Sequence, residues 1–126
     1  MKIKNRYTHK IIFAADVSTI KECIELAVRE GVSLQFADLY KDILWEADLR
    51  GSDLRMADLR WTDLRGAQLR MSNLQKADLF GTNLRGAHLQ WSNLRGADLR
   101  FSNLLWADLR WADLCETDLR RAKRIP

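Results

Sequence analysis

Leucine recurs every five residues through most of this 126-residue chain. The series runs from Leu34 to Leu119, and all eighteen of its positions are leucine. A period of five fits neither regular element. A helix would turn by about 500° between leucines, and a strand would present successive leucines on opposite faces. A corner once per five residues resolves the conflict, because each unit then forms one side of a closed coil with its leucine inside.

The remaining positions of the unit also repeat, as residues 47–51 illustrate with Ala, Asp, Leu, Arg and Gly. A small residue stands two before most leucines, Asp or Asn stands directly before, and Arg often follows. Asp and Asn favour turns because their side chains bond nearby backbone amides. We therefore expect the leucine and the small residue to point into a narrow tube, and the other positions to point outward.

Three units carry a family resemblance: Ala-Asp-Leu-Arg-Gly at 47–51, Ala-Asp-Leu-Arg-Trp at 57–61 and Ala-Asp-Leu-Arg-Phe at 97–101. They resemble the A(D/N)LXX pattern of the pentapeptide repeat proteins, and the resemblance covers residues 32–122. It implies an all-β fold, a right-handed quadrilateral β-helix with four units per coil. The units Val32-Ser33-Leu34 and Asp42-Ile43-Leu44 depart from the pattern.

The first 31 residues carry no repeat, and their pattern predicts two short strands, Lys2–Tyr7 and Lys10–Ala14, followed by a helix. Thr19 with Glu22 three residues later is a capping-box signature, and Gly31 is a plausible helix stop. We expect this hairpin and helix to cover the open N-terminal end of the coil, as solenoid ends require. The chain is thus divided into an N-terminal capping hairpin and helix at 1–31, a pentapeptide-repeat β-helix at 32–122 and a basic tail at 123–126.

The C-terminal end of the coil has no comparable cap in the sequence. An uncovered last coil would expose core leucines and unpaired strand amides. Several pentapeptide repeat proteins, which this chain resembles, dimerise through their C-terminal coils. We therefore expect a two-fold homodimer. The residues of the predicted dimer end are Leu104, Leu109, Leu114 and Leu119.

Aromatic residues are frequent at the outward positions after leucine, particularly toward the C-terminal end. One interpretation is aromatic stacking between coils. The other is a surface for a partner protein, because exposed aromatic patches mark interfaces. The predicted interaction surface consists of Trp91, Trp106, Trp111, Phe101 and Leu105.

The net charge of +4 first suggests nucleic-acid binding, but residues 32–121 carry thirteen basic and thirteen acidic side chains and sum to zero. Binding to phosphates needs a local basic field, so nucleic acid is not the expected partner. An Asp column is expected along the tube, compensated by Arg. Its members are Asp38, Asp58, Asp78, Asp98 and Asp118.

The sequence contains no arrangement typical of a catalytic, cofactor or metal site. Cys23 and Cys115 are too few for a disulfide framework, which favours a cytoplasmic location, and no apolar run is long enough to span a bilayer. We predict a non-enzymatic structural or protein-interaction module with an unidentified protein partner and no cofactor. The alternative comes from the resemblance to quinolone-resistance proteins of the same family, and is a DNA mimic that modulates a topoisomerase such as gyrase.

Overall fold

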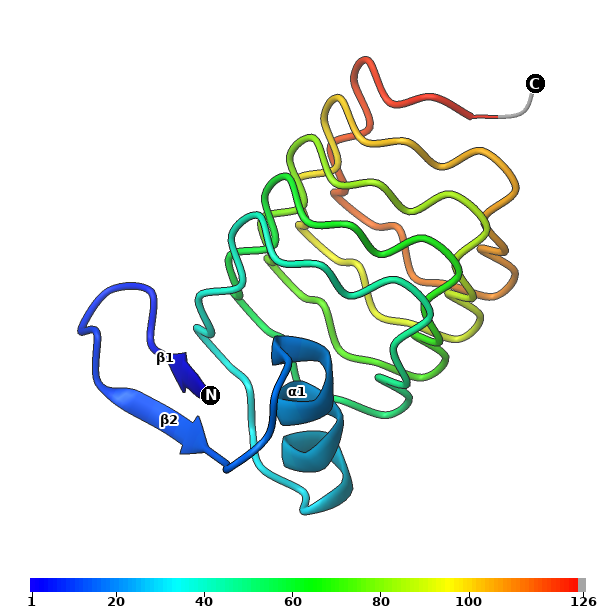
Figure 1. Ribbon diagram of the computed structural model, residues 1–126. Helices are drawn as coiled ribbons and strands as arrows, with labels where there is room; N and C mark the ends of the chain where they lie inside the picture. The colour runs from blue at the N-terminus through cyan, green and yellow to red at the C-terminus, as the bar shows by residue number, and fades with distance from the viewer. Residues whose placement is uncertain (125–126) are drawn as a thin grey trace.

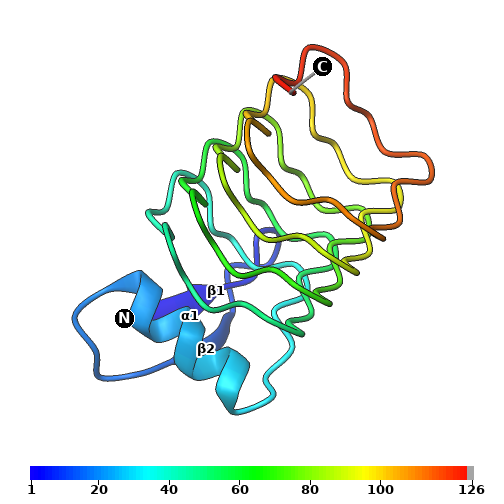
Figure 2. The same ribbon diagram turned by 90° about the vertical axis from the view of Figure 1, so that its right-hand side faces the viewer.

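The computed structural model describes residues 1–124, which form a square coil of stacked turns with a small hairpin and helix at its lower end (Figure 1). Isolated parallel bridges join residues twenty apart, such as Asp58 with Asp78 and Asp63 with Asn83. Twenty residues are four units, so each coil of the tube has four sides. The view from the side in Figure 2 shows the successive coils lying in register along the axis.

A corner follows every leucine of the series. The second residue after each of the eighteen leucines has a positive φ, and only five of these residues are glycine. The amide of the next small residue closes the corner, as when Ala47 donates to the Leu44 carbonyl at 3.1 Å. The aspartate side chain also fixes the backbone that leads into the corner, since Asp48 Oδ1 accepts from the amide of Arg50 at 3.3 Å. The predicted corner and the turn role of Asp are both confirmed.

Adjacent coils are joined by backbone hydrogen bonds on all sides. The amide of Leu54 donates to the carbonyl of Asn73 in the next coil at 2.8 Å, and the amide of Asp58 donates to Ala37 in the previous coil at 2.8 Å. Each unit therefore contributes its bonds to both neighbours. Because each of these bonds joins two coils, a single coil would lack them, and the coils are stable only when they are stacked.

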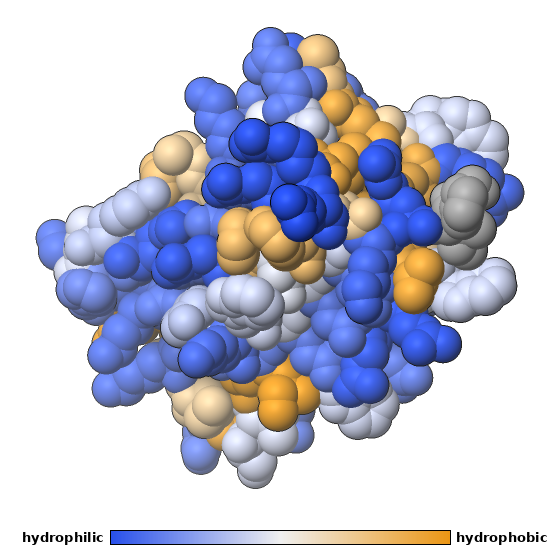
Figure 3. Space-filling model, turned by 90° about the horizontal axis from the view of Figure 1, so that it is seen from above, coloured by the Kyte–Doolittle hydropathy of each residue, from blue (hydrophilic) through white to orange (hydrophobic). Residues whose placement is uncertain are grey.

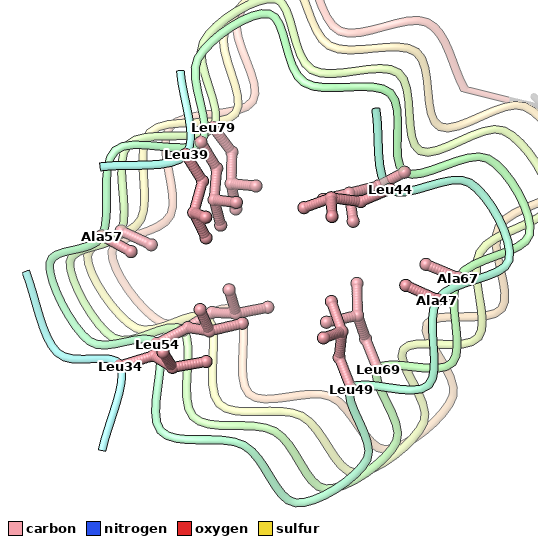
Figure 4. Close-up of a cluster of buried hydrophobic side chains, with 14 of the residues drawn as sticks. Leu34, Leu39, Leu44, Ala47, Leu49, Leu54, Ala57, Ala67, Leu69 and Leu79 are labelled. Atoms are coloured by element: carbon pink, nitrogen blue, oxygen red, sulfur yellow. The ribbon is translucent and has the colours of Figure 1, made fainter. Parts of the chain in front are cut away.

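The interior of the tube holds the leucines and the small residues (Figure 4). Leu34, Leu49 and Leu69 are completely buried, and Figure 4 shows leucines of successive coils lying one behind the other. Where the small residue carries a hydroxyl, that hydroxyl in most units donates to a backbone carbonyl, as in the bond of 2.6 Å from Thr62 Oγ1 to the Leu59 carbonyl. The buried Ser52 hydroxyl is the exception and has no partner among residues 1–124. The prediction of inward leucine and inward small residue is confirmed.

The N-terminal hairpin consists of β1 (Lys2–Lys4) and β2 (Ile11–Ala14), which pair antiparallel. Both strands are shorter than the sequence indicated. The first ends early because Asn5 begins a turn, with its Oδ1 accepting from the amides of Tyr7 at 2.8 Å and Thr8 at 3.1 Å. The hairpin continues onto the first coil, where the amide of Asp38 donates to the Lys4 carbonyl at 2.8 Å.

Helix α1 (Ile20–Arg29) follows the hairpin. Thr19 is its N-cap and accepts from the amide of Glu22 at 3.1 Å, while the Glu22 carboxylate reaches the amide of Ser18 at 3.4 Å instead of completing the box on Thr19. Gly31 follows the helix with a φ of 72°. The buried face of α1 contains Cys23, Ile24 and Ala27, which join the same core cluster as the leucines.

The C-terminal boundary lies one residue beyond the predicted end of the coil, since Lys123 still bridges to Asn103. The predicted basic tail extends into residues 125 and 126, which lie outside the described residues. In the described part of the chain, no helix has the length and apolar character needed to traverse a bilayer.

Candidate interaction surface

The outer surface of the tube is built from repeated ion pairs. In an Asp-Leu-Arg unit the guanidinium folds back onto the carboxylate two residues earlier, as when Arg65 donates from Nε to Asp63 Oδ1 at 2.8 Å. This fork lowers the pKa of the Asp63 carboxyl. Seven units form it: Asp48 with Arg50, Asp53 with Arg55, Asp58 with Arg60, Asp63 with Arg65, Asp98 with Arg100, Asp108 with Arg110 and Asp118 with Arg120.

The predicted Asp column is present along one side of the tube, where Asp38, Asp58, Asp78, Asp98 and Asp118 bridge in sequence. The negative charge of this column is compensated partly by arginines of the same units and partly by Arg6 of the N-terminal segment. Arg6 approaches the carboxylates of Asp58 at 3.9 Å and Asp78 at 3.8 Å. Asp78 has Phe80 in the place of Arg, and burial raises the pKa of its carboxyl. The side is therefore largely neutralised rather than strongly acidic.

One corner of the tube carries an exposed apolar column of Met71, Trp91 and Trp111, which occupy equivalent positions on three successive coils. The two indole rings are stacked, with centroids 5.1 Å apart and planes at 12°. Their exposed fractions remain high, 71% for Met71, 57% for Trp91 and 62% for Trp111. Stacking between coils thus occurs here and leaves a continuous apolar edge in water. We call these three residues the aromatic column.

The opposite corner carries a different aromatic cluster. Phe101, a predicted member of the interaction surface, packs against Phe80 at 5.3 Å, and Phe80 meets the ring of Trp61 edge-on at 5.6 Å. Phe101 lies ten residues, half a coil, from both Trp91 and Trp111. The structure therefore does not bring Phe101 together with the stacked tryptophans.

Trp106 and Leu105 occupy a third corner, between these two. Trp106 is 68% exposed and Leu105 is half-buried. Trp106 borders a groove of about 390 Å³. The groove is lined by Arg65, Asn83, Arg85, Gly86, Asn103 and Trp106. The predicted surface is thus distributed over three corners, and sequence reasoning missed Met71, whose place in the twenty-residue register was its only signal.

The C-terminal end of the tube exposes part of its interior. Leu104 is 3% exposed, whereas Leu109, Leu114 and Leu119 are half-buried because no described coil lies beyond them. Within residues 1–124 the amides of these three leucines have no backbone acceptor, although equivalent amides in earlier coils do. Figure 3, viewed from above, shows apolar surface among hydrophilic side chains at this end.

The two cysteines are in different environments. Cys23 is buried in α1, and burial raises the pKa of its thiol, while Cys115 is exposed at a corner near the C-terminal end. Among residues 1–124, no three His, Cys, Asp or Glu side chains are grouped to hold a metal ion.

Comparison with known proteins identifies this architecture. The family profile described as pentapeptide repeats matches residues 43–81, 72–110 and 102–123, with 8 copies. The chain belongs to the pentapeptide repeat family. Its coil is accordingly the right-handed quadrilateral β-helix that the resemblance implied.

Solved pentapeptide repeat proteins are similar in sequence. Rfr23 from the cyanobacterium Cyanothece 51142 is 36% identical over 70% of this chain and 57% of its own, with a TM-score of 0.61. This chain therefore spans less than two thirds of Rfr23. The protein alr5209 from Nostoc Pcc 7120 is 31% identical over 82% of this chain and 78% of its own, with a TM-score of 0.34.

QnrB1, a plasmid-mediated fluoroquinolone resistance protein, is 20% identical over 66% of this pentapeptide repeat chain and 58% of its own, with a TM-score of 0.42. That likeness is too low to carry an argument about function. No curated protein matches the sequence.

Proposed function

We propose that this pentapeptide repeat protein is a non-enzymatic module that binds another protein through the aromatic column. The carrying observation is the stacked pair Trp91 and Trp111 with Met71 beside it, all mostly exposed. Tryptophan is enriched at the energetic centres of interfaces because it covers a large apolar area with few rotatable bonds. The stack also restrains both rings before binding, which lowers the entropy cost of ordering them.

A capture experiment tests this proposal. The wild type, Trp91→Ala plus Trp111→Ala, and Trp61→Ala plus Phe101→Ala serve as baits for proteins of the source cell. The first double variant should lose a specific partner, with affinity falling by at least about tenfold in a follow-up titration. The second removes two aromatics at the opposite corner and should retain it. Recovery of the same partner by all three baits would refute the assignment.

The C-terminal end is proposed as the contact of a homodimer. Leu109, Leu114 and Leu119 present partly exposed core, and their unpaired amides match an edge that a second strand ladder can complete. Sedimentation equilibrium at micromolar concentration should give twice the monomer mass, and Leu109→Lys plus Leu119→Lys should give a monomer. A monomeric wild type at that concentration would end the dimer proposal.

The hairpin and α1 are proposed as the cap of the N-terminal end. Ile24 and Ala27 of α1 are fully buried, and Glu25 Oε2 accepts from the amide of Asp48 at 2.8 Å. Removal of residues 1–31 should therefore expose the first coil and cause aggregation. A soluble 32–126 fragment with unchanged unfolding midpoint would show that the cap is dispensable.

The second candidate is a duplex mimic acting on gyrase, and the Asp column is the observation that favours it. Asp58, Asp98 and Asp118 are each paired with an Arg two residues later, which reduces the acidic field that such a mimic needs. A supercoiling assay separates the candidates, since a mimic should inhibit gyrase at equimolar protein. An unchanged supercoiling rate at large molar excess would eliminate this candidate.

A further inference from the structure

The identity of the residue before leucine decides whether the following arginine can form a fork within its own unit. Asp forms the fork, but Asn or Gln cannot neutralise a guanidinium. Arg95, which follows Asn93, instead pairs with Asp113 of the next coil at 3.6 Å. Arg70 follows Gln68 by two residues and Arg85 follows Asn83 by two, and neither has a carboxylate within 4.0 Å among residues 1–124. The net charge of the repeat segment is zero, but its unpaired charges are therefore unevenly distributed around the tube.

Both free arginines border the same side of the tube. This side is formed by segments 45–51, 65–71, 85–91 and 105–111 on four successive coils, and we call it the Gln68–His88 face after the two residues at its centre. Asp108 follows them in the same column, but it is occupied by Arg110 at 2.7 Å and by Gln90 Nε2 at 2.7 Å. Asp48 at the start of this column is likewise paired with Arg50. Glu46 stands at the edge of the face beside Gly66, and it is the one carboxylate of these segments without an ion pair among residues 1–124.

The Asp column lies half a coil away, on the side opposite the Gln68–His88 face. Asp therefore occupies all five positions of the Asp column, whereas the column on the opposite side holds Gln68 and His88 between Asp48 and Asp108. Arg70 stands at one corner of the Gln68–His88 face, and Arg85 stands at the other corner, in a groove that it shares with Asn83 and Asn103 of the adjacent side. A ligand lying across the whole face therefore meets two guanidinium groups that are free to form charge-assisted hydrogen bonds.

Apolar side chains stand at both edges of this face. The aromatic column runs along one edge beside Arg70, and Trp106 stands at the other edge in the groove that also contains Arg85. The floor of that groove is open at Gly86, because no atom lies within 4 Å of the position a Cβ would take there. Each free cation is therefore adjacent to an exposed apolar group.

We propose that the Gln68–His88 face binds an acidic and apolar segment of a partner protein. Carboxylates of the segment pair with Arg70 and Arg85, and its apolar side chains pack on the aromatic column and Trp106. The proposal rests on the proposed function, to which it adds the chemistry of the partner. A nucleic acid is disfavoured because tracking a phosphate backbone needs more cations than two free arginines provide.

The test uses fluorescence anisotropy with labelled peptides of about eight residues. One peptide alternates Glu with Leu, one Gln with Leu and one Lys with Leu. The Glu peptide should bind about tenfold more tightly than the Gln peptide at low salt, and the Lys peptide should bind most weakly. Arg70→Gln plus Arg85→Gln should remove the advantage of the Glu peptide.

The matched control is Arg55→Gln plus Arg120→Gln, which makes the same change in net charge at two arginines that are already forked. It should change the affinity for the Glu peptide by less than about twofold. Circular dichroism verifies that both double variants are folded, as expected for substitutions of exposed side chains. Equal weakening by the two double variants would mean that only net charge matters, and would overturn the proposal.

Two further outcomes overturn it: failure of the Glu peptide to bind more tightly than the Gln peptide, or tighter binding of a single-stranded oligonucleotide that depends on Arg70 and Arg85. The proposed function is judged separately by the capture experiment. If Trp91→Ala plus Trp111→Ala loses the partner while the charge series shows no preference, the interaction module stands and the acidic-partner inference fails.

Discussion

Asp42 offers a quantitative test of the core pattern. It occupies the inward position that Thr62, Thr82 and Ser102 occupy in later coils, and its carboxylate has no hydrogen bond or ion pair to a residue within 1–124. It borders an apolar groove of about 510 Å³ between the start of α1 and the first coil. Burial, with a smaller contribution from Asp38, raises the pKa of the Asp42 carboxyl to about 6.

The pKa shift fixes the sign and size of the effect of Asp42→Asn. A rise from 3.8 to about 6 corresponds to about 3 kcal/mol, and residual solvent exposure reduces this to about 1–2 kcal/mol. Between pH 3.8 and about 6, the Asp42 carboxyl is protonated in the folded state but ionised in the unfolded state. The penalty is therefore absent below pH 3.8, grows as the pH rises and is complete above about pH 6.

Urea unfolding followed by tryptophan fluorescence at several pH values measures the prediction. Asp42→Asn should be more stable than the wild type by about 1–2 kcal/mol at pH 8, with the difference vanishing as the pH falls to about 4. Asp53→Asn is the control of opposite sign, because the fork with Arg55 lowers the pKa of Asp53 to about 2. A difference for Asp42→Asn that is independent of pH, or a destabilised variant at pH 8, would refute the reasoning.

Three further substitutions test the packing by chemical denaturation. Gly81→Ala should destabilise by about 1–3 kcal/mol more than Gly86→Ala, because only at Gly81 would the added Cβ meet the Trp61 ring, at 2.5 Å; equal losses, or no relief in a Trp61→Ala background, would contradict this. Leu69→Ala should cost about 3 kcal/mol, and a loss below about 1 kcal/mol would mean that the tube collapses onto the void. Thr19→Ala should cost about 1 kcal/mol through loss of the α1 cap, and an unchanged midpoint would show that the bond to Glu22 contributes nothing.

The coil was predictable because it is a local property repeated many times. A leucine every five residues excludes helix and flat strand, and an Asp or Asn before it supplies the turn. The corner itself had no residue signature, since thirteen of the eighteen positive-φ corner residues in the repeats are not glycine. Their conformation is imposed by the hydrogen bonds to neighbouring coils, which outweigh the local preference against a left-handed backbone.

The interaction surface was predictable only in part. The stacking of Trp91 on Trp111 follows from their separation of twenty residues, and the structure bears it out. Phe101 was assigned to the same surface because it is near in sequence. In a square coil, however, two outward residues share a corner only when their separation is close to a multiple of twenty. Met71, which is distant in sequence from Trp111, therefore belongs to the column, and Phe101 does not.

The sequence alone determined the tube: its period, its leucine interior and the alternation of inward and outward positions are all fixed by residues within one unit. The tertiary structure decided how charge and aromatic area are distributed around the tube. The charges summed along the repeat segment give zero, whereas stacking places the Asp column on one side and the free Arg70 and Arg85 at the two corners of the opposite side. The physical reason is that each coil closes after twenty residues, so units that are distant in sequence become neighbours. The side chains that form one surface therefore come from successive coils and not from consecutive positions in the chain.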